Sequence, residues 1–102
     1  MKKVIDGKTY NTETATEIGN YSYLYNGDFH YIDETLYVTG KGTFFLAGEG
    51  GAASKYSTDL GNNSSGSGYG MEVLTTGEAL QWCEDHDIDA DTIAEYFDIE
   101  EG

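Results

Sequence analysis

Acidic side chains recur at helical spacing near the C-terminus of this sequence. Five of them lie three or four positions apart: Glu84, Asp87, Asp91, Glu95 and Asp98. Side chains at this spacing share one face of a helix, so a continuous helix would align them in a row, whereas a break near His86 would leave two adjacent clusters. Duplex DNA carries about one negative charge per 1.7 Å of axis, and carboxylates displayed in this way can occupy a basic channel much as phosphates do.

We therefore predict a partner-binding surface made of seven acids: Glu84, Asp85, Asp87, Asp89, Asp91, Glu95 and Asp98. The partner expected for such a surface is a basic, nucleic-acid-binding protein. Tyr and Phe side chains near the acids would supply the apolar anchors that carry much of the binding energy in protein interfaces.

The same run also offers the oxygen ligands that calcium prefers. A calcium loop beginning at Asp85 would place Ala90 where the sharp turn needs glycine, and Tyr96 where a bidentate acid is needed. A loop beginning at Asp87 would place Thr92 at the glycine position. The spacing therefore does not predict a metal site.

Cys83 and His86 are the other side chains that could bind a metal or take part in catalysis. Their spacing is half of a zinc site, and a thiol beside an imidazole can serve as a nucleophile with its base. His30 is the only other imidazole, and there is no second thiol. We expect Cys83 to be a core residue and the protein to be non-catalytic and free of cofactors. A small metal-binding protein or enzyme that uses Cys83 and His86 stays as an alternative.

The charge of the chain is strongly and unevenly negative. The 102 residues include 19 acids against five lysines and no arginine, for a formal net charge of -14. All five lysines precede residue 56, whereas residues 56–102 contain 12 acids and neither Lys nor Arg. Binding to nucleic acid needs a basic surface, so the composition argues against it. The negative field instead favours encounter with basic partners, unless it serves only solubility.

Several segments that would indicate another compartment are missing from the sequence. No apolar run approaches the roughly 18 residues of a membrane span, and Met1–Asp6 lacks the apolar centre of a secretory signal. A single cysteine excludes an internal disulfide and suits a reducing compartment. We expect one cytoplasmic domain over residues 1–102 without membrane contact.

Turn-forming residues divide the N-terminal half into short elements. Asp6-Gly7 predicts a tight hairpin, and Asn11 or Thr12 could cap a helix from Thr12 to Ile18. Alternating tyrosines over 21–25 indicate a strand. The richest apolar runs, 29–38 and 43–47, flank a glycine-containing turn and predict an antiparallel hairpin over 29–47 at the centre of a sheet.

The C-terminal half begins with a Gly/Ser-rich segment over 61–70, which is typical of a flexible loop, and 71–74 could add a strand. Thr75 and Glu78 have the spacing of a capping box and predict a helix that breaks at His86-Asp87. Asp89 then predicts the cap of a second helix over 90–97. The expected fold class is α+β, a small antiparallel sheet with two C-terminal helices packed on one face.

Four segments resemble a family of small acidic proteins carried by phages, plasmids and other mobile elements of Gram-positive bacteria. They are IDGKTYNTETA at 5–15, LYVTGKGTFFL at 36–46, GEGGAASKY at 48–56 and TTGEALQW at 75–82. The resemblance implies a bacterial host cell and, for some members, action as anti-CRISPR proteins. These motifs are structural in type, so no catalytic residue transfers to this chain.

Charge and resemblance together predict an inhibitor of a host nucleic-acid-directed defence enzyme, anti-CRISPR or anti-restriction, that binds the enzyme directly as a DNA mimic. A non-catalytic accessory or regulatory protein of a mobile element, whose acidity serves solubility, is the other alternative.

Overall fold

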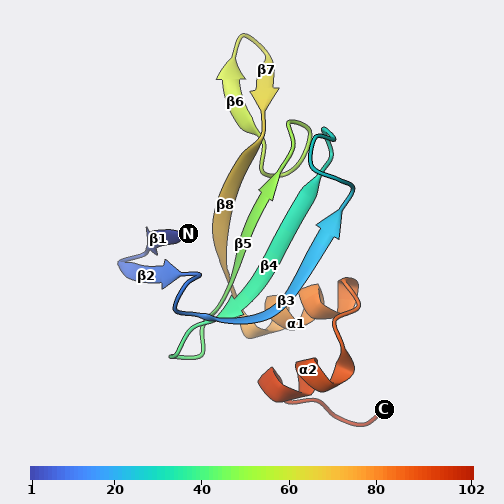
Figure 1. Ribbon diagram of the computed structural model, residues 1–102. Coiled ribbons are helices and arrows are strands. Elements are labelled where there is room, and N and C mark those ends of the chain that lie inside the picture. The colour runs from blue at the N-terminus through green and yellow to red at the C-terminus, as the bar shows by residue number, and fades with distance from the viewer.

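The computed structural model describes residues 1–102 and has the α+β class expected from the sequence. Strands dominate, and the two helices close the chain (Figure 1). The strands are β1 (Lys2–Ile5), β2 (Lys8–Asn11), β3 (Thr16–Tyr23), β4 (Ile32–Val38), β5 (Phe44–Gly50), β6 (Thr58–Gly61), β7 (Ser64–Gly66) and β8 (Gly68–Leu74). The helices are α1 (Thr76–Asp85) and α2 (Ala90–Tyr96).

The strands form three antiparallel sheets, where the sequence predicts one small sheet. β3, β4, β5 and β8 make a four-stranded sheet in that order, while β1–β2 and β6–β7 are separate hairpins. The expected central pair is present, since β4 and β5 are neighbours in the middle of the larger sheet with Leu36 opposite Leu46. This pair covers 32–50 and not 29–47, because 29–31 belong to the preceding loop and Gly48–Gly50 continue β5.

The N-terminal hairpin is confirmed, with Asp6 and Gly7 both at positive φ in the turn between β1 and β2. The helix expected from Thr12 to Ile18 is wrong. The amides of Thr14 and Ala15 bond the carbonyl of Asn11 in a single turn, and β3 begins at the next residue. Ile18 is buried at a bulge in β3, so burial and pairing with β4 override a weak helical preference.

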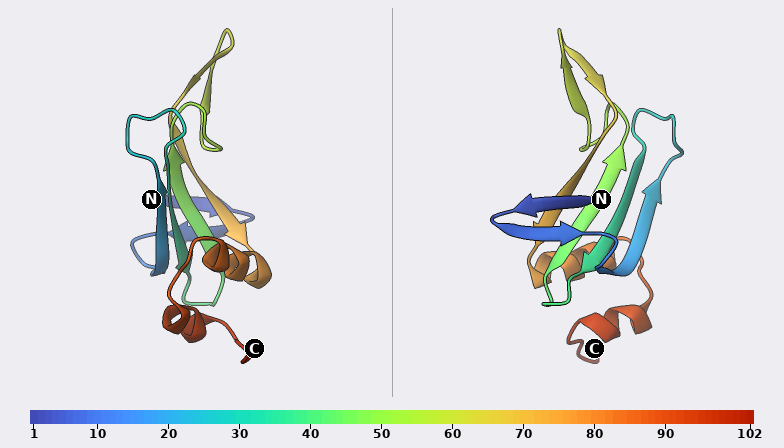
Figure 2. Two further views of the ribbon diagram at one scale, coloured as in Figure 1. Left: turned by 90° about the vertical axis from the view of Figure 1, so that its right-hand side faces the viewer. Right: turned by 60° about the vertical axis from the view of Figure 1, so that its left-hand side comes forward.

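The Gly/Ser-rich segment 61–70 carries regular pairing that its composition does not predict. Asn62 and Asn63 adopt positive φ in the turn that joins β6 to β7, a conformation that asparagine tolerates better than most residues. The β6–β7 hairpin extends beyond one end of the four-stranded sheet (Figures 1 and 2). β8 then begins at Gly68, earlier than the strand expected over 71–74.

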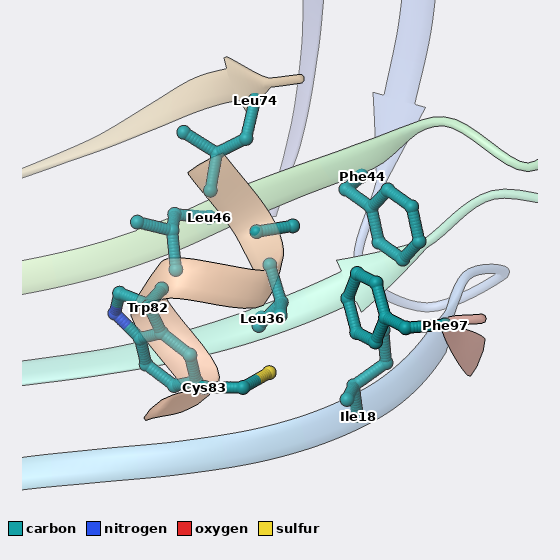
Figure 3. Close-up of a cluster of buried hydrophobic side chains, with 9 residues drawn as sticks. Ile18, Leu36, Phe44, Leu46, Leu74, Trp82, Cys83 and Phe97 are labelled. Atoms are coloured by element: carbon teal, nitrogen blue, oxygen red, sulfur yellow. The ribbon is translucent and has the colours of Figure 1, made fainter. Parts of the chain in front are cut away.

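The helices and one face of the four-stranded sheet enclose the core, whose nine buried residues are Ile18, Leu36, Phe44, Leu46, Leu74, Ala79, Trp82, Cys83 and Phe97 (Figure 3). The ring of Phe97 stacks on that of Phe44 at 4.9 Å between centroids, which joins the end of α2 to the sheet as expected. Full burial of one such side chain stabilises the fold by about 1.5–3 kcal/mol. The helices that carry the acids are therefore fixed to the sheet.

The other face of the sheet is covered in part by the β1–β2 hairpin. Tyr10 of β2 packs edge-on against Phe45 at 5.4 Å, and Tyr37 stacks on the same ring at 5.2 Å. Neither helix has the length and apolar character needed to cross a membrane.

Candidate functional site

All seven predicted contact residues are exposed, and they lie on three consecutive pieces of chain. Glu84 and Asp85 end α1, and Asp87 and Asp89 belong to the connection. Asp91 and Glu95 lie in α2, and Asp98 follows it. The break near His86 excludes a single helical row. The acids therefore form two adjacent helical groups joined by an acidic turn, and we call this set the acidic helical surface.

The turn between the helices has a fixed geometry. Asp87 adopts a φ of 54°, and the amide of Ile88 bonds the carbonyl of Cys83 at 3.0 Å. This is the pattern of a Schellman helix end, with aspartate where glycine is usual. Ile88 also packs on β3, where a Cβ on Gly19 would lie 2.7 Å from Ile88 Cδ1. The acids of the turn are thus carried on a docked backbone.

α2 begins and is oriented as the sequence predicts. The Asp89 carboxylate accepts a hydrogen bond from the amide of Thr92 at 3.3 Å, so it is the N-cap of the helix. Ile93 packs against the core, whereas Asp91 and Glu95, four positions apart, are exposed. The outer side of this short helix is therefore carboxylate-rich.

No basic group neutralises the acidic helical surface. The protein has one lysine ion pair, Lys55 with Glu34 at 2.7 Å, and one His–Asp contact, His30 with Asp28 at 3.8 Å. Asp85 accepts a hydrogen bond from Gln81 at 2.8 Å, which leaves its charge in place. None of the seven carboxylates thus has a lysine or histidine within ion-pairing distance.

Cys83 and His86 are packed into the fold. The thiol is fully buried, and burial together with the nearby Glu84 raises the pKa of Cys83, which favours the unreactive protonated form. The His86 ring stacks on Tyr21 at 3.9 Å and meets the edge of Trp82 at 4.9 Å. No three His, Cys, Asp or Glu side chains are grouped so that they could hold a metal ion.

The structure also shows a buried charged cluster that our sequence reasoning did not identify. Glu34, 4% exposed, receives hydrogen bonds from the Tyr56 hydroxyl and from Trp82 Nε1, as well as the ion pair from Lys55. Burial opposes ionisation, but these three donors outweigh it and lower the pKa of Glu34 below its ordinary value. One signal was available in the sequence, because Glu34 lies in phase with Ile32, Leu36 and Val38 on the inward side of its strand.

Glycines in β5 and β8 make room for this cluster. Residues 51–57, which we call the strap, lie against Gly48, Gly50, Gly68 and Gly70. A Cβ at Gly48 would collide with the Tyr56 ring, and one at Gly68 would collide with the Tyr56 carbonyl. The segment GEGGAASKY at 48–56 is therefore a structural motif, in which small residues let Lys55 and Tyr56 reach Glu34.

The most exposed aromatic side chains do not surround the acidic helical surface. Tyr25 and Phe29 lie in the β3–β4 loop and Tyr69 lies near the start of β8, each more than 70% exposed. This loop and the start of β8 are at the end of the sheet opposite the helices (Figure 1). The expectation of aromatic anchors beside the acids is therefore not met by these residues, and Tyr96 on α2 is partly buried.

The chain matches no protein-family model, no curated protein and no solved structure.

Proposed function

We propose that this protein is a non-catalytic inhibitor that binds a basic nucleic-acid-binding protein, such as a host defence nuclease, through its acidic helical surface. The observation that carries the proposal is the group of seven exposed carboxylates over 84–98, none of which has a cationic partner. Carboxylates in this state attract lysine and arginine side chains from a distance and accelerate encounter.

The proposed mode is occupation of a channel that otherwise holds nucleic acid. A channel of this kind carries several Lys and Arg side chains spaced to meet phosphates. The acidic groups at the end of α1 and along α2 would each meet a part of it, with the turn between them adding Asp87 and Asp89. Binding would release counterions from both surfaces, so it would weaken steeply as salt is raised.

Two triple variants of equal net charge test the proposal. The helical variant carries Asp91→Asn, Glu95→Gln and Asp98→Asn, whereas the control neutralises three exposed acids elsewhere, with Glu13→Gln, Glu17→Gln and Glu72→Gln. Asp89 and Asp87 stay unchanged because they shape the ends of the helices. Each protein is immobilised and used to capture nucleic-acid-binding proteins from a Gram-positive bacterial lysate.

The wild-type protein and the control should retain a basic nuclease that the helical variant loses by at least about tenfold, as expected for several close charge pairs. Added duplex DNA, and salt raised to about 0.5 M, should both displace it. Equal capture by the two triple variants would favour the accessory role in which acidity serves solubility. Capture that DNA does not displace would contradict the channel mode.

A further inference from the structure

An open cleft of about 750 Å³ lies at the end of the sheet opposite the helices. One wall is the β3–β4 loop with Asp28 and Phe29, the floor is the end of β5, and the other wall is the β7–β8 segment with Tyr69. Only four of its 14 lining residues are hydrophobic. A cleft of this size and polarity suits a polar ligand rather than the mainly apolar ligands of most small-molecule pockets.

The cleft is lined by two carboxylates, of which Asp28 lies 3.8 Å from the exposed His30 whereas Glu49 has no basic partner. No Lys, Arg or His is among the lining residues of the cleft. The Tyr31 hydroxyl donates to Glu49 Oε1 at 2.7 Å, which orients the carboxylate, while Oε2 receives no hydrogen bond from the protein. This hydrogen bond also raises the pKa of Tyr31 to about 12, so the phenol stays neutral and remains a donor. A carboxylate held in place with a free oxygen is an acceptor for a cationic donor.

Two aromatic side chains accompany these carboxylates. Phe29 is 71% exposed and Tyr69 is 76% exposed, each contributed by a different wall. Tyr69 is the register partner of Glu49, so their side chains lie on the same face of the sheet. An exposed ring beside a carboxylate meets both needs of a guanidinium group, which stacks on aromatic faces and bonds carboxylate oxygens in its plane.

We propose that this cleft binds an arginine side chain presented by a partner protein, with Glu49 accepting the guanidinium hydrogen bonds and Tyr69 or Phe29 stacking on its plane. The site is separate from the acidic helical surface and does not depend on the function proposed for that surface. Charge complementarity selects a cation over a neutral ligand such as a sugar, for which aromatic rings alone would suffice.

The probe is N-acetyl-arginine amide, titrated into the full-length protein and followed by amide and aromatic NMR signals. N-acetyl-citrulline amide has nearly the same shape without the charge and is the matched ligand control. The arginine compound should shift signals of Phe29, Tyr31, Glu49 and Tyr69, and should bind about tenfold more tightly than the citrulline compound. Glu49→Gln should weaken it at least about fivefold, and Tyr69→Ala should also weaken it, whereas Glu95→Gln on α2 should not.

Three outcomes would overturn the inference. The first is equal binding of arginine and citrulline compounds, the second is tighter binding of methyl glucoside than of arginine, and the third is a shift pattern spread over α2 and absent from the cleft. Dispersed NMR spectra of Glu49→Gln and Tyr69→Ala show that any loss of binding comes from the cleft itself. Because the probe carries one charge and the readout is residue by residue, failure here leaves the proposal for the acidic helical surface standing.

Discussion

Glu34 is a buried carboxylate whose hydrogen-bonding needs are met by residues from other parts of the fold. Three elements supply its surroundings: the strap provides Lys55 and Tyr56, α1 provides Trp82, and the carboxylate itself comes from β4. No buried side-chain polar atom in the protein lacks a hydrogen-bond partner. Removing one member of such a buried group leaves the others unsatisfied, which costs more than the net contribution of the group.

We predict that Glu34→Gln lowers the free energy of unfolding by about 2–3 kcal/mol, because Lys55 and Tyr56 lose their acceptor charge. Urea unfolding of the variant and of Glu72→Gln, an exposed acid on β8, measures the difference. Glu72→Gln should stay within about 0.5 kcal/mol of the wild-type protein. If Glu34→Gln also changed the free energy of unfolding by no more than about 0.5 kcal/mol, the buried ion pair would make no net contribution to stability.

The pH dependence of this residue has a definite sign. The folded protein holds the pKa of Glu34 below its ordinary value of 4.5, so the ionised group stabilises the fold above that pH and loses the contribution as pH falls through the folded pKa. The stability difference between wild type and Glu34→Gln should therefore shrink below about pH 4.5. A difference independent of pH from 7 to 3 would contradict this assignment.

At the scale of elements, the strap depends on glycines in the strands beneath it. We predict that Gly68→Ala destabilises the protein by about 1–3 kcal/mol, because the new methyl would collide with the Tyr56 carbonyl and with Thr58 Oγ1. Gly77→Ala is the matched substitution, since nothing lies within 4 Å of the position and it belongs to α1. That variant should gain about 0.5 kcal/mol from helix propensity. Urea midpoints compare the two, and equal effects would reject the packing explanation.

Elements with a strong local signal could be predicted from the sequence. The capping box is formed, with Thr75 Oγ1 accepting from the amide of Glu78 and Glu78 Oε1 accepting from that of Thr75. Asp6-Gly7 and Asp89 also act as expected. The strand predicted over 21–25 is only the end of β3, whose first residues were assigned to a helix because their partner β4 is distant in sequence. The β6–β7 hairpin was not predicted because its Gly- and Ser-rich composition is typical of a loop. Asn11 does bond within a local turn, but pairing with β4 makes the next residues a strand and not a helix.

The site was predictable only in part, for the same reason. The exposure of the seven acids could be predicted from their charge. The end of α1 could be predicted from the residues His86-Asp87. Glu34 was not recognised because its donors come from residues 21, 22 and 48 positions away. The cleft likewise joins the β3–β4 loop to the β7–β8 segment, and no local pattern connects them.

At the scale of the whole molecule, the protein is elongated. It measures 50 × 33 × 20 Å, and its radius of gyration of 14.9 Å exceeds the value of about 13 Å typical of this length. The acidic helices lie at one end, and the β3–β4 loop and the start of β8 lie at the other (Figures 1 and 2). That loop and strand carry the most exposed aromatic residues. A partner that covers only one end would leave the other free for a second contact.

Self-repulsion among 19 acids should make stability depend on salt. We predict that sodium chloride raised from about 20 mM to about 500 mM increases the melting temperature by about 4–8 °C, which corresponds to about 1 kcal/mol in a domain of this size. Thermal unfolding followed by circular dichroism measures this. The double variant Asp91→Lys and Glu95→Lys should show a smaller rise. An unchanged rise would place the repulsion elsewhere than at the helices.

The left-handed backbone at Asp87 has a practical consequence for separating affinity from folding. Glycine is the residue best suited to that conformation, so Asp87→Gly removes one carboxylate while relaxing the bend that carries it. This charge deletion should therefore stabilise the fold and not weaken it. If this variant no longer binds a partner, the missing carboxylate is the cause and not a change in folding.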